Sequence, residues 1–143
     1  MRKMTEQRQQ LEEGIKALTP RLAAQLPQLK KMMQNLATHV AFVRHGDPEF
    51  EEAKKNFLHI LEELIRFSQT NFHNGQLLYR INAEAINLVR LMKEEMNGLV
   101  ELDKAVSKCT YQNLRQEVPK IHAIITNLEK VYTAEVQLVQ AFD

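Results

Sequence analysis

The chain has 143 residues, of which 44% are apolar and 26% are charged, and its formal net charge is +1. This length suits a single domain, and the apolar fraction excludes an intrinsically disordered chain. A single cysteine excludes an intramolecular disulfide and a cysteine-based zinc site. The near-neutral charge lacks the basic excess that is typical of nucleic-acid binders. No apolar run is long enough to span a membrane, and the polar residues 5–10 do not fit a signal peptide, so we expect a cytoplasmic protein.

Apolar residues recur at steps of three and four along almost the whole chain, which is the pattern of amphipathic helices. The first expected helix covers residues 5–44, and its apolar positions follow a coiled-coil-like heptad with one extra step of four. Pro20 and Pro27 lie inside it, and each should bend it because proline lacks the amide donor. The helix either bends and continues, or breaks at Thr19-Pro20, where threonine could cap a new helix.

Three further helices are expected, separated by short turns. The sequence His-Gly-Asp-Pro at residues 45–48 predicts the first turn, and a second helix should cover residues 48–72. Asn74-Gly75 predicts the next turn, because both residues favour turns. The third and fourth helices should cover residues 78–106 and 114–142. The apolar stripes that we assign to these three helices include Phe67, Met96 and Val136.

These elements predict an all-α fold in one domain that covers residues 1–143. Short connections force neighbouring helices to be antiparallel, so we expect a single up-down-up-down four-helix bundle with a long, proline-kinked first helix. Residues 1–18 would form an N-terminal helical extension. Six apolar residues near the middle of the bundle should form its core: Phe57, Leu61, Leu88, Met92, Ile121 and Ile125.

An interaction surface is expected at one end of this bundle. If the second helix ends near residue 72, the first and fourth helices extend beyond it and cover only one face of each other. The apolar strip left open would mark a contact site. It consists of Leu11, Ile15, Leu18, Val136, Val139 and Phe142. A second copy of the chain could cover it as a homodimer. Alternatively, an N-terminal helix that breaks at Thr19-Pro20 could fold back over its own bundle.

Motifs for metal, cofactor and nucleophile chemistry are scarce. No histidine has a glutamate three residues before it, so the Glu-x-x-His pattern of di-iron bundles does not occur. No glycine-rich phosphate-binding loop occurs either. We therefore expect neither a metal nor a cofactor. Cys109 lies alone at a helix junction, where it is either a reactive thiol or a semi-exposed small residue.

One pattern supports a catalytic alternative. Six residues separate Arg66 from His73, a spacing that the helical HEPN ribonucleases and toxins carry, and Arg115 and His122 repeat it. Chance accounts for such matches in a chain with five histidines. A HEPN-like ribonuclease or toxin-type enzyme that uses Arg66 and His73 is therefore the alternative. Our main expectation is a non-enzymatic protein–protein interaction module, namely an adaptor, small chaperone or regulatory subunit, whose partner is a protein rather than a nucleic acid.

Overall fold

The computed structural model describes residues 2–39 and 48–142, and all regular secondary structure in these ranges is helical. The prediction of an all-α fold is therefore confirmed. None of the described helices is both long and apolar enough to cross a membrane. The predicted turn at residues 45–47 lies outside the described residues. The elements are α1 (Arg2–Ala23), α2 (Leu26–Ala37), α3 (Pro48–Ile81), the short 3-10 helix η1 (Ala83–Ala85), α4 (Ile86–Ser107) and α5 (Leu114–Gln140).

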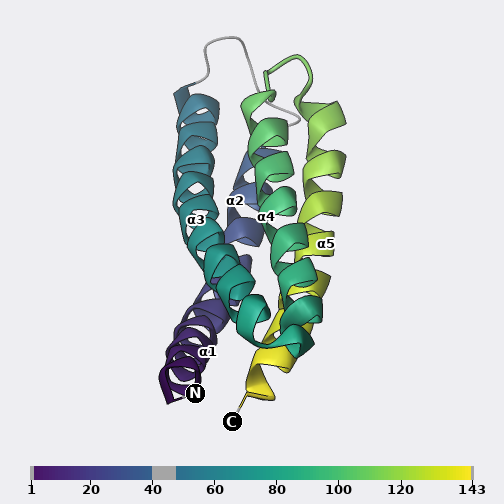
Figure 1. Ribbon diagram of the computed structural model, residues 1–143. Coiled ribbons are helices and arrows are strands. Elements are labelled where there is room, and N and C mark those ends of the chain that lie inside the picture. The colour runs from purple at the N-terminus through teal and green to yellow at the C-terminus, as the bar shows by residue number, and fades with distance from the viewer. Residues whose placement is uncertain (1, 40–47, 143) are drawn as a thin grey trace.

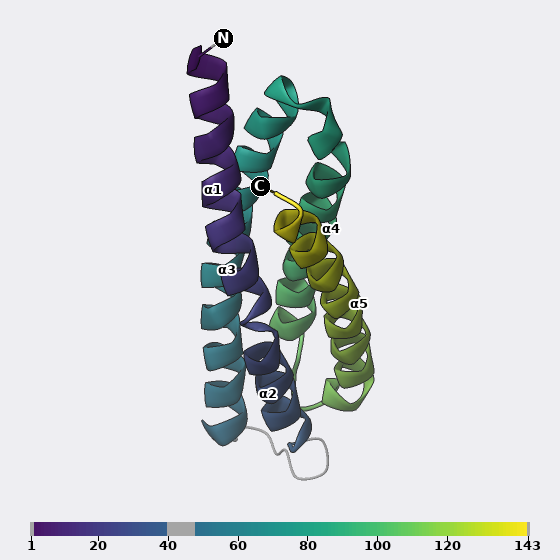
Figure 2. The same cartoon turned by 90° about the horizontal axis from the view of Figure 1, so that it is seen from below.

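The helices lie side by side along a common long axis (Figure 1). Helix α3 packs against α4, and α4 packs against α5. Both α1 and α2 pack against α3 and α5, so together they occupy one position beside the other three helices. Figure 2 shows α1 and α2 as one bent path next to α3. The start of α1 and the turn between α3 and α4 lie at the same end of the molecule in both views.

The first expected helix is broken, and the break lies between α1 and α2 rather than at Thr19-Pro20. Pro20 lies inside α1, where its carbonyl accepts the amide of Ala24 at 2.9 Å. Pro27 lies in the first turn of α2, a position where a missing amide is tolerated. Because Pro27 has no amide, the carbonyl of Ala23 four residues earlier has no helical partner there. The chain therefore leaves the helix at Ala24 and Gln25, just before Pro27.

The predicted turn at Asn74-Gly75 is wrong, because α3 continues through both residues to Ile81. Gly75 is buried, and a Cβ atom at this position would lie only 2.5 Å from the Sδ atom of Met92 on α4. The missing side chain thus lets α3 and α4 approach closely. Packing outweighs the weak helix propensity of glycine, which is a difference of only about 1 kcal/mol.

The turn between α3 and α4 forms instead at Asn82. Its side chain accepts the backbone amide of Glu84 at 3.1 Å, and this bond caps η1. Helix α4 then begins at Ile86 and not near residue 78. The hairpin of α3 and α4 is consequently longer than the sequence suggested.

The longer hairpin covers much of the strip that was expected to be open. Ile15 and Val139 are almost completely buried, in a cluster with Leu78 at the end of α3. The other members of the strip are partly buried, namely Leu11, Leu18, Val136 and Phe142. The geometric reason for an open strip, a hairpin that ends at Asn74-Gly75, is therefore absent.

All six predicted core residues are buried, each with at most 2% of its surface exposed. They are divided between two apolar clusters. The larger cluster contains Phe57, Leu61, Ile121 and Ile125, and the smaller cluster near the α3–α4 turn contains Leu88 and Met92.

Candidate functional site

The apolar interior contains a group of buried polar side chains. They come from α1, α3, α4 and α5, and each has at most 2% of its surface exposed. Buried glutamates in particular are rare unless they are paired. We call this group the buried polar cluster. It consists of Thr19, Ser68, Asn71, Glu95, Tyr132 and Glu135.

The two glutamates are buried because they occupy core positions of the heptad pattern. Helical side chains separated by alternating steps of four and three share one face. Such steps place Glu95 between Met92 and Leu99 on α4, and Glu135 between Tyr132 and Val139 on α5. Sequence reasoning missed both residues, because it assigned the neighbouring Met96 and Val136 to the stripes. Those two side chains are only partly buried.

The carboxyl groups of Glu95 and Glu135 lie next to each other, and burial raises the pKa of both. A carboxylate can only accept hydrogen bonds, so two ionised groups would have no donor between them. The hydrogen bond with Glu95 raises the pKa of Glu135 further, and the same bond lowers the pKa of Glu95. Burial and the neighbouring carboxyl group of Glu95 together favour the neutral form of Glu135.

Two hydroxyl groups lie near this pair. Ser68 lies near Glu95 and lowers its pKa, although its hydroxyl does not reach good hydrogen-bond geometry. The Tyr132 hydroxyl is close enough that the charges of Glu95 and Glu135 add to the effect of burial in raising its pKa. Neither glutamate forms an ion pair with a basic side chain among the described residues. No cationic side chain among the described residues would therefore balance a negative charge on this pair.

Asn71 connects this cluster to α1. Its Nδ2 atom donates to the Oγ1 atom of Thr19 at 2.9 Å, and both residues are buried. This bond uses the nitrogen of the amide and leaves the Oδ1 atom as an acceptor without a partner. In the part of the chain that the structure describes, seven buried side-chain oxygens lack a hydrogen-bond partner. They belong to Ser68, Asn71, Tyr132 and the two glutamates.

Arg66 and His73, the residues of the catalytic alternative, lie on the exposed side of α3. Arg66 donates to the Oε1 atom of Glu62 at 3.1 Å, within the same helix. The surface hollow that Arg66 lines extends toward Glu51 and does not include His73. The structure therefore does not bring this arginine and this histidine together in one cavity.

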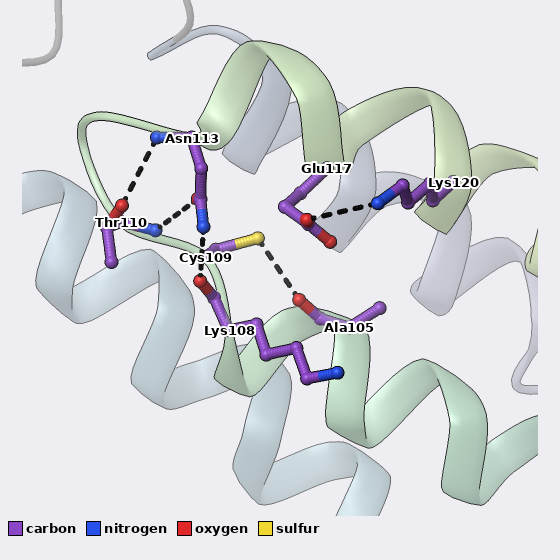
Figure 3. Close-up of polar contacts among 7 residues, drawn as sticks. All are labelled: Ala105, Lys108, Cys109, Thr110, Asn113, Glu117 and Lys120. Carbon is purple, nitrogen blue, oxygen red and sulfur yellow. Dashed lines mark hydrogen bonds and ion pairs between the residues drawn. The ribbon is translucent and has the colours of Figure 1, made fainter.

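Cys109 is buried in the loop between α4 and α5, and not semi-exposed (Figure 3). Its Sγ atom donates to the carbonyl of Ala105 at 3.4 Å. Burial is the main reason that its pKa rises to about 11, and the nearby carboxylate of Glu117 adds to this effect. A thiol with a raised pKa is a poor nucleophile, so the geometry argues against a reactive cysteine.

The same loop is held by Asn113 at the start of α5 (Figure 3). The backbone amide of Thr110 donates to the Oδ1 atom of Asn113 at 2.7 Å, and the Nδ2 atom of Asn113 donates to the carbonyl of Lys108 at 2.8 Å. Lys54 on α3 donates to the carbonyl of Cys109 at 2.9 Å. These bonds satisfy the backbone of the turn, which is a structural role.

The second feature of interest is an apolar groove on the surface between α1 and α3. Phe67 lines its edge and is 52% exposed, the largest value among the large hydrophobic residues described. The groove has a volume of about 180 Å³. Its apolar floor and its charged rim come from both helices. We call it the α1–α3 groove, and its lining residues are Leu18, Arg21, Leu22, Gln25, Ile60, Glu63, Leu64 and Phe67.

No protein-family model and no curated protein matches this chain. Among the described residues, no group of three or more histidine, cysteine, aspartate or glutamate side chains is arranged to hold a metal ion. The buried polar cluster contains only two such side chains, Glu95 and Glu135, and its other oxygen atoms are neutral. The buried polar cluster and the α1–α3 groove are thus the two candidate functional sites of the described chain.

Proposed function

We propose that the chain is a non-enzymatic protein–protein interaction module, of the adaptor, small-chaperone or regulatory-subunit kind, and that the α1–α3 groove is its contact surface. The observation that carries the proposal is Phe67, which is half exposed at the edge of an apolar groove. Aromatic residues are enriched in protein interfaces, and an aromatic anchor that fills a pocket often dominates the binding energy. The groove is smaller than the roughly 300–1,000 Å³ of small-molecule sites, so a side chain suits it better than a ligand.

The occupant that we propose is a second copy of the chain, so that the protein is a homodimer. Phe67 and the groove lie on one face, and a two-fold axis would place each Phe67 in the groove of the other copy. The rim carries one positive residue, Arg21, and one negative residue, Glu63. In a two-fold contact, Arg21 of each copy would face Glu63 of the other, and this complementarity favours self-association.

The scaffold that presents this surface is, in our proposal, a single antiparallel up-down-up-down four-helix bundle. The sequential packing of α3, α4 and α5 supports it, as do the contacts of α1 and α2 with both α3 and α5. In this arrangement α1 and α2 count as one kinked member. The groove then lies where α1 approaches its break at Ala24 and Gln25, next to α3.

The oligomeric state tests this proposal directly. We expect the unmodified protein to be a dimer at micromolar concentration in sedimentation or light scattering. Phe67→Glu should yield a folded monomer with unchanged helical circular dichroism. Tyr79→Glu is the matched control, because Tyr79 is also an exposed aromatic residue of α3, at 42%, and does not line the groove. This variant should remain dimeric.

A charge exchange adds a sharper test of the geometry. Arg21→Glu should weaken the dimer because it places two acidic residues opposite each other, and Glu63→Arg should weaken it by the reverse repulsion. The double variant should recover the dimer, because the pair is restored with opposite polarity. A protein that is monomeric at high micromolar concentration, or a double variant that recovers nothing, would rule out a second copy in the groove.

A further inference from the structure

The oxygen atoms of the buried polar cluster have the composition of a cation site. All seven of the unpartnered buried side-chain atoms among the described residues are oxygens. Six of them come from four side chains on neighbouring helices: Ser68 and Asn71 on α3 with one each, Glu95 on α4 and Glu135 on α5 with two each. Carboxylate, amide and hydroxyl oxygens are the ligands that hard divalent cations prefer, usually six to eight in number for Ca²⁺.

The charge of the two carboxyl groups also favours a bound cation. Two ionised carboxylates in the interior would carry two negative charges, and no basic side chain of the described residues forms an ion pair with either. Uncompensated charge in an apolar interior is strongly unfavourable. A proton on Glu135 removes one of the two charges and gives Glu95 one donor. It supplies nothing to the Oδ1 atom of Asn71.

Ser68 and Asn71 supply the neutral side-chain oxygens on α3. Asn71 and Ser68 are three residues apart, so they lie on the same face of α3. The bond from Asn71 to Thr19 uses the amide nitrogen and makes the amide oxygen the available atom. The Tyr132 hydroxyl is near enough to both carboxyl groups that their charges raise its pKa.

We propose that Glu95 and Glu135, together with the neutral oxygens of Ser68 and Asn71, bind a divalent cation of the Ca²⁺, Mg²⁺ or Mn²⁺ type. Binding displaces the proton from Glu135, so that cation and proton compete for the same carboxyl pair. A surface hollow of about 270 Å³ between α2 and α5 reaches Tyr132. It is lined on one side by Ala23 and Leu26, the residues on either side of the α1–α2 break.

Thermal unfolding of the full chain tests the proposal. Protein purified with a chelator and then dialysed is melted with CaCl₂, MgCl₂ or MnCl₂ at millimolar concentration, and with NaCl at equal ionic strength. We expect at least one divalent salt to raise the melting temperature by more than about 3 °C over NaCl, the shift that roughly 1 kcal/mol of ligand stabilisation produces in a domain of this size. Calorimetric titration in buffers of different ionisation enthalpy should show release of about one proton per bound cation.

Matched variants separate this site from surface binding. Glu135→Gln and Glu95→Gln keep the shape of the side chain and remove one carboxylate, so each should abolish the divalent-specific rise. Glu101→Gln makes the same substitution at an exposed position of α4 and should leave the rise unchanged. Two results would overturn the proposal: no divalent salt raises the melting temperature of the unmodified protein above that in NaCl, or Glu135→Gln shows the same rise. Protons alone would then neutralise the carboxyl pair.

Discussion

Replacing Gly75 with alanine should destabilise the protein, although alanine is the better helix former. Gly75 lies in the interior of α3, and its backbone packs against α4. A Cβ atom there would come within 2.5 Å of the Sδ atom of Met92 and 3.6 Å of the Cγ2 atom of Val89. Met92 is only 1% exposed, so its thioether has to shift within the packed interior. The substitution therefore requires a shift of Met92 or of the two helices.

Two opposing terms set the magnitude. Alanine gains about 1 kcal/mol over glycine in a helix interior. Overpacking of a filled core costs typically about 1–3 kcal/mol. The net effect of Gly75→Ala should be a loss of up to about 2 kcal/mol in the free energy of unfolding. Gly14 supplies the control, because a Cβ atom there meets no atom within 4 Å. Gly14→Ala should therefore show the helix term alone, a gain of up to about 1 kcal/mol.

Urea unfolding followed by circular dichroism measures both values, and a double-mutant cycle with Met92→Ala isolates the contact. Met92→Ala alone should be destabilising because it leaves a cavity. In that background Gly75→Ala should become stabilising, since the atom that it meets has been removed. The coupling energy between Gly75→Ala and Met92→Ala should equal the free-energy cost of overpacking, about 1–3 kcal/mol. If Gly75→Ala stabilises the unmodified protein as much as Gly14→Ala does, α3 and α4 do not approach closely at this point and our account of the turn is wrong.

Three further predictions concern the core, the cysteine and the carboxyl pair. Leu88→Ala and Ile121→Ala should each lower the free energy of unfolding by about 2–5 kcal/mol in urea titrations, because both side chains are buried. The pKa of Cys109, raised to about 11 from 9.0, should make the folded protein react with a thiol reagent at pH 8 about 100-fold more slowly than the urea-unfolded chain. Because the folded-state pKa of Glu135 is raised, its neutral form stabilises the fold most below the unfolded value of 4.5, and the melting temperature should fall as the pH rises from there toward the folded-state pKa. With chelator present, Glu135→Gln should flatten this dependence between pH 5 and pH 9, and an equally steep slope in the variant would contradict it.

The helices were predictable because the three- and four-residue steps persist over most of the chain, whereas the turn between α3 and α4 was not. Asn74-Gly75 has the local composition of a turn, yet it lies within α3 because Gly75 fits against Met92. Asn82, where the chain does turn, is followed by Ala, Glu and Ala, which favour helix locally. Only the packing of Gly75 against Met92 distinguishes Asn74-Gly75 from Asn82. Local propensity alone therefore predicts the turn at the wrong position.

The buried carboxyl pair could have been predicted from a stricter reading of the heptads. Steps of four, three and four from Leu88 lead through Met92 to Glu95 and then to Leu99 on one face of α4. Preference for apolar residues placed Met96 in that stripe instead. The partner relationship between Glu95 and a glutamate of α5 was not predictable, because it depends on the relative shift of two helices along their axes.

The buried polar cluster and the exposed aromatic residue come from one property of the sequence. At three pairs of neighbouring positions a polar residue occupies the core position of the heptad, and the apolar residue beside it lies at the edge or outside. The pairs are Phe67 with Ser68, Glu95 with Met96, and Glu135 with Val136. Each exchange lowers stability, because it exposes apolar surface and removes polar groups from water. The same exchange gives the aromatic side chain that we propose as a protein contact and the oxygen atoms that we propose as cation ligands. Ligands that bind only the folded state add stability that grows with the logarithm of their concentration divided by Kd, so a partner at the groove and a cation in the interior would each offset part of what the exchanges remove.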